Sequence, residues 1–141
     1  MAIRLTIVTP ERSLVNEEVD ELQIPGANGY LGVLPGHAPL FTELKVGELS
    51  YRKGTTWISL VVAWGFAEVI NDQVRVLAET AERANEIDLE RAIRSKERAE
   101  DRLKSGKEID FDRARIALER AIIRIQVARK NQHAEIGRAH V

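Results

Sequence analysis

The sequence predicts an α+β protein in which an N-terminal antiparallel β-sandwich is followed by a C-terminal antiparallel two-helix hairpin. Residues 1–83 contain many short apolar stretches separated by turn signals, a pattern typical of sandwiches and barrels. Residues 78–130 contain no proline and one glycine, and they are rich in helix formers such as Ala, Arg, Glu, Lys and Leu. The 141 residues suit one domain or two small ones, and we place the boundary between 1–83 and 84–134.

The first strand is predicted by alternation, because Ile3, Leu5 and Ile7 have polar neighbours and Pro10 ends the run. Gly54 and the pair Asn71-Asp72 indicate hairpin turns further along. The other predicted strands are 14–15, 19–24, 41–44, 48–51, 56–63, 66–70 and 74–77.

The segment Gly26–Leu40 holds four of the nine glycines and two of the four prolines. Glycine permits positive φ and close backbone approach, whereas proline fixes φ and removes a donor. Apolar residues lie between them, so we expect a tightly folded, partly buried crossing between strands.

Gly106 is predicted to divide the helical region, with Asp88 and Asp110 as the N-caps of the two helices. A short connection favours an antiparallel pair. The apolar stripes are thin and rich in alanine, so the hairpin is expected to be stable only when docked and is a candidate mobile element. The stripes comprise Ala92, Ala99 and Leu103, then Ala114, Leu118, Ala121, Ile125 and Ala128.

Residues 135–141, Glu-Ile-Gly-Arg-Ala-His-Val, match the translation of a common sequencing-adapter run. We expect them to be a non-native tail, and a natural frayed end is the alternative.

Composition and charge argue against several classes of function. The net charge of −1 argues against general nucleic-acid binding, and the absence of cysteine excludes disulfides and thiol chemistry. No apolar run is long enough to span a bilayer, so any membrane connection is expected to run through a partner. Residues 1–83 carry a net charge of −4 and residues 84–141 a net charge of +3. The basic second half favours an acidic partner or a phosphate ligand, and a solvated, ion-paired helix pair is the plainer alternative.

Several motifs, in order, resemble the epsilon-subunit family of rotary ATP synthases, whose mitochondrial counterpart is called delta. The main motif is Gly-Tyr-Leu-Gly-Val-Leu-Pro-Gly-His-Ala-Pro-Leu at 29–40. The others are Val-Thr-Pro-Glu-Arg at 8–12, Gly-Phe-Ala-Glu-Val at 65–69, Val-Leu-Ala-Glu-Thr-Ala-Glu at 76–82 and Ile-Asp-Leu-Glu-Arg-Ala at 87–92.

The resemblance implies a non-catalytic central-stalk subunit of a proton-translocating F-type ATP synthase. Such a subunit couples rotor rotation to ATP synthesis and inhibits ATP hydrolysis through its C-terminal helices. The implied partners are the gamma subunit, the c-subunit rotor ring and the alpha/beta catalytic head. The implied location is peripheral, on the cytoplasmic face of the cell inner membrane, or on the thylakoid membrane in a photosynthetic source. No cofactor is required, and ATP is a possible regulatory ligand.

By resemblance, Tyr30, Leu31 and His37 contact gamma and the rotor ring. The family often has a carboxylate where Tyr30 stands, so an aromatic contact replaces a charged one. A histidine bonded within its own tight loop is an equal alternative for His37. Trp64 stands where the family usually has a small residue, and its apolar neighbours favour core packing over an interface role.

The motif at 87–92 resembles the ATP-binding motif of bacterial family members. Arginine forks suit phosphate, and folding the hairpin would bring four of them together. A capped helix with surface ion pairs is the alternative, because 109–114 nearly repeats the motif as a plain helix start. The residues matching the family's nucleotide-contacting positions are Glu82, Asp88, Arg91, Arg98, Arg120 and Arg124.

Two other functions stay open. One is a free-standing β-sandwich adaptor whose basic hairpin binds an acidic partner. The other is an enzyme that uses His37 with a carboxylate, although no serine has a nucleophile context. Hydrolysis of ATP by this chain is not expected, because it has no glycine-rich phosphate loop and no metal-ligand cluster in its sequence.

Overall fold

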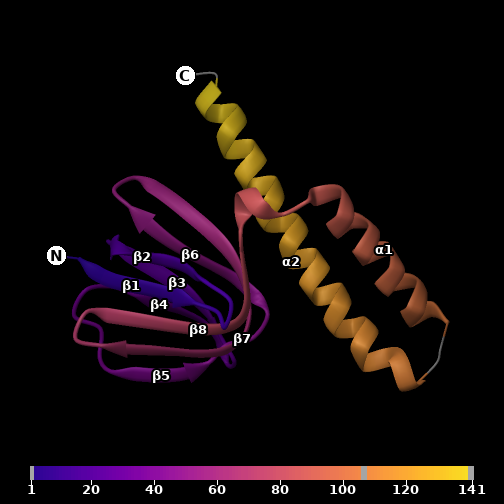
Figure 1. The fold of residues 1–141 in the computed structure, drawn as a ribbon, viewed down its shortest axis with the longest axis horizontal. Helices are drawn as coiled ribbons and strands as arrows, with labels where there is room; N and C mark the ends of the chain where they lie inside the picture. Colours follow the sequence, from indigo (N-terminus) through magenta and orange to yellow (C-terminus); the bar gives the residue numbers. More distant parts are fainter. Residues whose placement is uncertain (1, 106–107, 140–141) are drawn as a thin grey trace. The chain divides into compact units, whose positions relative to one another are not determined.

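The computed structural model describes the backbone of residues 2–105 and 108–139 and the side chains of residues 2–105 and 111–132. The chain divides into two compact units, residues 1–83 and 84–141. Strands build the first unit and helices build the second (Figure 1), which confirms the predicted α+β class.

Eight strands form the first unit, and seven of them follow the order β2-β1-β8-β7-β6-β3-β4 while β5 pairs with β7. Neighbouring strands are antiparallel except β1 and β8, which are parallel. Parallel pairing is possible because the rest of the unit connects these two strands. The strands are β1 (Ile3–Val8), β2 (Ser13–Val19), β3 (Glu21–Gly26), β4 (Gly29–Val33), β5 (Leu40–Glu43), β6 (Gly47–Lys53), β7 (Thr56–Ile70) and β8 (Gln73–Arg83).

The central segment is not only a crossing as predicted. Its first half forms β4, which pairs with β3 through a tight turn at residues 27–28 and ends the sheet. The loop from Leu34 to Pro39 then leads to β5. The glycines in β4 lowered the strand propensity of the stretch, and pairing with β3 overrides that preference.

The strand β7 changes partner along its length. Its first half pairs with β6, whereas Phe66–Val69 pairs with β5. Between these halves Trp64 has φ 54° and Gly65 has φ 107°. Positive φ bends the strand and lets one chain segment serve both parts of the sandwich. The two predicted strands 56–63 and 66–70 are therefore one kinked strand, and Trp64 lies half-buried at the kink rather than in the core.

The last strand ends at Arg83 and the helical unit begins at Ala84, although the composition rich in helix formers begins at Ala78. Residues 78–83 are mostly helix formers, yet they continue β8 because they pair with β7 from Leu60 to Gly65. Tertiary pairing decides the conformation here against local propensity.

Inward-facing residues from β1 to β8 fill one hydrophobic core, and most of them alternate with exposed neighbours along their strands. The fully buried large side chains are Ile3, Leu5, Ile7, Val19, Leu22, Ile24, Val33, Leu49, Leu60, Val62, Val69 and Val74.

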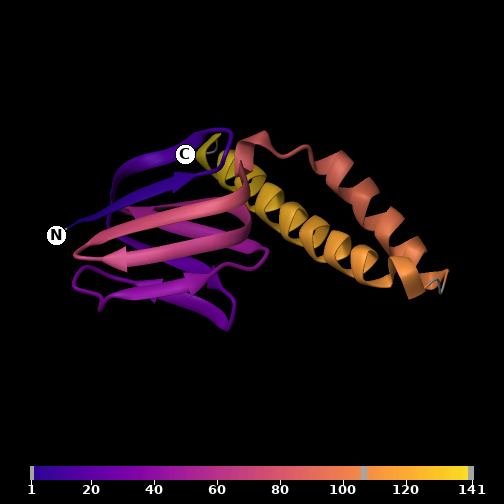
Figure 2. The ribbon, with the colours of Figure 1, turned by 60° about the horizontal axis from the view of Figure 1, so that its bottom comes forward.

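The second unit contains a short 3-10 turn (Ala84–Glu86), α1 (Leu89–Lys104) and α2 (Glu108–Ala139). The two helices lie side by side and run antiparallel (Figures 1 and 2), as predicted. Asp88 is the N-cap of α1, whereas Asp110 is not a cap because α2 already begins at Glu108. The predicted break at Gly106 lies outside the described residues.

Alanines form the contact between the helices. Ala92 and Ala99 on α1 and Ala114 and Ala121 on α2 are all buried, and both pairs are seven residues apart. Seven residues are nearly two helical turns, so each pair lies on one face. Small side chains allow close approach of the helix axes, but they bury little apolar area.

Candidate functional site

Tyr30 lies exposed on the edge strand β4, with 53% of its surface accessible. Its hydroxyl accepts a hydrogen bond from the Glu48 main-chain N–H at 3.1 Å, and the Lys45 ammonium lies 5.8 Å from the ring centroid. A Cβ at Gly47 would come within 3.0 Å of the Tyr30 hydroxyl. Glycine at 47 therefore makes room for the tyrosine, which is held in place rather than free to swing.

His37 is bonded within its own loop. Its Nδ1 lies 2.7 Å from the Ala38 carbonyl oxygen, so Nδ1 carries the proton and donates to that oxygen. The His37 main-chain N–H donates to the Leu34 carbonyl oxygen at 3.1 Å. The Gly36 N–H donates to Asp72 Oδ1 at 2.6 Å, which fastens the loop to the β7–β8 turn. This geometry matches the alternative of a histidine held in a tight loop.

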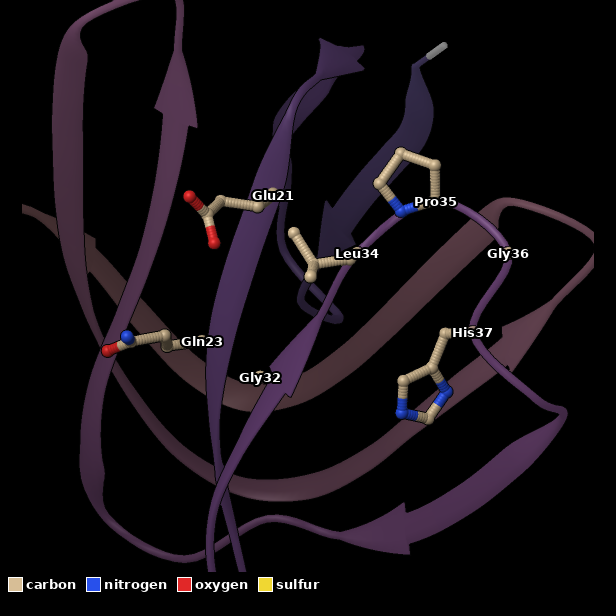
Figure 3. A pocket seen from close by; sticks show the side chains of 7 residues that line it. All are labelled: Glu21, Gln23, Gly32, Leu34, Pro35, Gly36 and His37. Atoms are coloured by element: carbon tan, nitrogen blue, oxygen red, sulfur yellow. The ribbon is translucent and has the colours of Figure 1, made fainter.

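A shallow hollow of about 300 Å³ lies between β3, β4 and this loop (Figure 3). His37 lines it, but Tyr30 and Leu31 do not, so the structure does not gather the three predicted contact residues into one pocket. The lining residues are Glu21, Gln23, Gly32, Leu34, Pro35, Gly36 and His37.

An exposed apolar patch, which we call the aromatic patch, lies on the outer face of β5, β7 and β8. Phe41 and Phe66 stack with their ring centroids 5.3 Å apart, although Phe41 is 65% and Phe66 is 43% exposed. Leu77 is directly opposite Phe66 in the sheet and is 56% exposed. Glu43 and Glu68 are the cross-strand partners of the two phenylalanines. Exposed stacked rings in a group mark an interaction surface.

The sequence reading missed the aromatic patch. Ala67 and Val69 are buried, so Phe66 lies in the opposite phase of the alternation. The sequence shows that Phe66 alternates with Ala67 along the strand. Because β7 is an almost continuous apolar run, the sequence does not show which of the two alternating sets of side chains faces the core. The meeting of Phe41 with Phe66 depends on the pairing of β5 with β7.

The residues predicted to contact ATP are spread over β8 and both helices. Asp88 Oδ1 accepts from the Arg91 main-chain N–H at 3.1 Å, as an N-cap does. Arg91 and Arg98 are exposed on α1, and Arg98 donates to Ser95 Oγ at 3.1 Å.

Arg120 and Arg124 are half-buried on α2, and Glu82 lies near the end of β8 in the first unit. Ion pairs along single helices, Lys96 with Glu100 at 3.8 Å and Arg115 with Glu119 at 3.2 Å, are the feature that the plainer alternative predicts.

The part of the chain that the structure describes contains neither a metal-binding group nor a membrane-crossing helix. No group of three or more His, Cys, Asp or Glu side chains there is arranged to hold a metal ion. No helix within that part combines the length and apolar character needed to cross a membrane.

Comparison with known proteins places both units. The family described as "ATP synthase, Delta/Epsilon chain, beta-sandwich domain" matches residues 2–84, and "ATP synthase, Delta/Epsilon chain, long alpha-helix domain" matches residues 85–129. The ATP synthase epsilon chain of Desulforamulus reducens is 55% identical over 126 residues, which cover 89% of this chain and 96% of the relative. That of Geobacter metallireducens is 51% identical over 131 residues, covering 92% and 95%.

Solved structures agree with this placement. A chain in the Euglena gracilis mitochondrial ATP synthase structure titled "OSCP/F1/c-ring in rotational state 1" has a TM-score of 0.78 at 29% identity, covering 85% of this chain and 77% of that one. A chain in the Tetrahymena thermophila mitochondrial ATP synthase central stalk and c-ring structure shares the fold, with a TM-score of 0.51 at 14% identity over 60% and 69% of the two chains. The family predicted from the sequence motifs is thus confirmed, and the chain belongs to the delta/epsilon family of ATP synthase subunits.

Proposed function

We propose that this chain works as the non-catalytic epsilon subunit in the central stalk of an F-type ATP synthase, where its sandwich binds the gamma subunit through the aromatic patch. The stacked, exposed pair Phe41 and Phe66 is the observation that carries this proposal. The names of the relatives, epsilon chains of ATP synthase, support the assembly in which the patch acts.

The patch suits a protein partner that is apolar at its centre. Aromatic side chains bring large contact area at low entropic cost and dominate interface energetics. The carboxylates of Glu43 and Glu68 border the rings, so the partner surface is expected to carry a basic rim. Tyr30, Leu31 and His37 remain proposed contacts of gamma and the rotor ring, outside this patch.

The test is the affinity of the full chain for purified gamma subunit. Phe66→Ala is expected to weaken binding by about tenfold to a hundredfold, as interface aromatics do. Trp57→Ala is the matched control, because Trp57 is also an exposed aromatic of β7, at 45%, but lies in the half that pairs with β6. Equal affinities for both variants and the unchanged chain would contradict the proposal. Failure of the unchanged chain to co-purify with gamma would favour the free-standing adaptor.

We further propose that the second unit inhibits ATP hydrolysis, with its basic helices meeting an acidic segment of the catalytic head. The net charge of +3 on residues 84–141 supports an electrostatic contact. Replacing Arg115, Arg120 and Arg124 with alanine should relieve inhibition in a reconstituted head while assembly persists. Inhibition that stays the same in the triple variant would rule out this electrostatic contact.

ATP is the ligand we propose for the hairpin, held by the arginines named above with Asp88, the N-cap of α1. Glu82, on β8, is the further residue that the family resemblance matches. Exposed guanidinium groups of Arg91 and Arg98 are accessible to phosphate oxygens. Calorimetric titration of the full chain with ATP should detect binding that Arg91→Ala and Arg98→Ala weaken. Arg94→Ala is the control, because Arg94 is equally exposed on α1 but lies outside the matched positions. An unchanged titration in all three variants would leave Asp88 as a helix cap alone.

The proposed location is peripheral, on the cytoplasmic face of the membrane that holds the rotor ring, or the thylakoid membrane in a photosynthetic source. Attachment runs through gamma and the ring. Immunodetection in membrane fractions, before and after release of the catalytic head and stalk, tests this location.

A further inference from the structure

The hollow beside His37 is not explained by the fold. Gly32 lines it, and a Cβ added at this position would meet no atom within 4 Å. A volume of about 300 Å³ is at the lower limit for small-molecule sites and has room for one long side chain. The fold thus leaves an open space that any side chain at position 32 would reduce.

Hydrogen-bond acceptors outnumber donors around this space. Nδ1 of His37 donates to the Ala38 carbonyl oxygen, so Nε2 is the ring nitrogen left for a further contact. Nε of Arg52 donates to Oε1 of Glu21 at 2.8 Å, and Glu21 Oε2 has no partner among the described residues. The Gln23 amide likewise has no protein partner in the described part of the chain. The main-chain donors of the loop, Gly36 N–H and His37 N–H, are already used within the protein.

We propose that this hollow, which we call the Gly32 socket, receives an arginine side chain of the gamma subunit. A guanidinium is planar, always charged and rich in donors, which matches the carboxylate of Glu21 and the amide oxygen of Gln23, two residues along on the same face of β3. The aliphatic stem would lie on Leu34, which is 56% exposed, and on the bare backbone of Gly32. Figure 3 shows Glu21 and Gln23 extending from β3 on one side of the hollow, with His37 on the other side. Lysine fits less well beside Glu21 and Gln23, because an ammonium is a point charge without the fork of donors that a guanidinium has.

The choice of gamma rests on the proposed function and on chain continuity. Phe41 of the aromatic patch follows His37 by four residues, so the two lie within about 14 Å even if the loop is fully extended. Gly36 is fastened to Asp72 in the β7–β8 turn, which keeps the socket next to the strands that carry the patch. A partner covering the patch can therefore reach the socket with one side chain.

The first experiment is an NMR titration of the full chain with N-acetyl-arginine amide. N-acetyl-citrulline amide, a neutral isostere, is the matched control. Saturable shifts at the amides of Gly32, Gly36 and His37 are expected with the arginine compound and not with the citrulline compound. Gly32→Leu should abolish them by filling the space, and Glu21→Gln should weaken them several-fold. Equal shifts with both compounds, or shifts that survive Gly32→Leu, would overturn the socket.

The second experiment measures gamma binding by Gly32→Leu. A loss of about tenfold is expected, with the melting temperature unchanged because position 32 has open space. Gamma binding that is normal in the unchanged chain and undiminished in Gly32→Leu would reject the socket and leave the proposed function standing. Absence of gamma binding in the unchanged chain would reject the proposed function, while the arginine titration would still judge the socket's chemistry.

Discussion

A side chain on Gly65 would place its Cβ 1.9 Å from the main-chain carbonyl oxygen of Leu77. Position 65 also has φ 107°, a conformation that L side chains rarely adopt. The two constraints coincide at the kink where β7 leaves β6 for β5, so the shape of the sandwich depends on this glycine.

Gly65→Ala is therefore expected to destabilise the sandwich by roughly 3 kcal/mol, through overpacking and backbone strain together. Urea unfolding followed by tryptophan fluorescence measures the effect, since both tryptophans, Trp57 and Trp64, lie in the first unit. Gly54→Ala is the control, because it has φ 63° and no atom within 4 Å of the added Cβ. It should cost only about 1 kcal/mol. Equal losses would show that positive φ, and not the carbonyl contact, dominates.

Tyr51 makes stability depend on alkaline pH. Burial, reinforced by a hydrogen bond with the Glu17 carboxylate, raises the pKa of Tyr51 to about 12. The folded-state pKa is above the unfolded value of about 10, so this contribution is complete below pH 10 and is lost as pH rises toward 12. We expect the free energy of unfolding to fall across that window and Tyr51→Phe to flatten the fall. Tyr30→Phe, which leaves Tyr51 in place, should keep it. A slope that persists in Tyr51→Phe would assign it to other groups.

Glu17, the hydrogen-bond partner of Tyr51, makes stability depend on acid pH. The ion pair with Lys53 at 3.0 Å is the main cause that lowers the pKa of Glu17. A carboxylate whose pKa is lowered in the folded state stabilises the fold at pH values above its unfolded-state pKa, here near 4.5. This contribution is lost as the pH falls through the folded-state pKa. Glu17→Gln should reduce the loss of stability on acidification below pH 4.5, measured as the urea midpoint against pH. Glu18→Gln, one residue away and outside the ion pair with Lys53, is the control.

The alanine contact between the helices predicts sensitivity to size. Ala92→Leu should force α1 and α2 apart, because Ala92 is fully buried, and overpacking of this kind costs about 1–3 kcal/mol. Far-UV circular dichroism should show a less stable helical signal, while tryptophan fluorescence of the sandwich keeps its midpoint. Glu97→Leu, at an exposed position of α1, adds a leucine without this penalty and serves as the control. A stable hairpin in Ala92→Leu would mean that the alanines do not set the helix spacing.

The first unit should fold by itself. Every member of its core cluster lies between Ile3 and Ala81. A fragment of residues 1–83 is expected to unfold cooperatively, and it retains Arg83, whose guanidinium donates to the Leu14 carbonyl oxygen. A fragment ending at Ala78 loses the pairs of Val62 with Ala81 and Ala63 with Thr80, so it should be markedly less stable. A broad, non-cooperative transition for 1–83 would show that the second unit is needed.

Features encoded by near neighbours were readable in the sequence. Alternation predicted β1, turn residues predicted the hairpins at Gly54 and Asn71, and Asp88 was recognised as the cap of α1. Each depends on residues a few positions apart, so periodicity and capping chemistry are sufficient. The family was readable too, because ordered motifs keep their spacing along the chain.

Features that depend on distant residues came only from tertiary contacts. Residues 78–83 favour helix locally, yet pairing with β7 makes them strand. The kink at Gly65 is set by the carbonyl of Leu77, and the aromatic patch exists because β5 pairs with one half of β7. The Gly32 socket likewise needs β3, β4 and the His37 loop together. Local patterns determine which elements form, whereas long-range pairing decides which faces remain exposed to bind partners, since exposure is a property of the assembled sheet and not of any one strand.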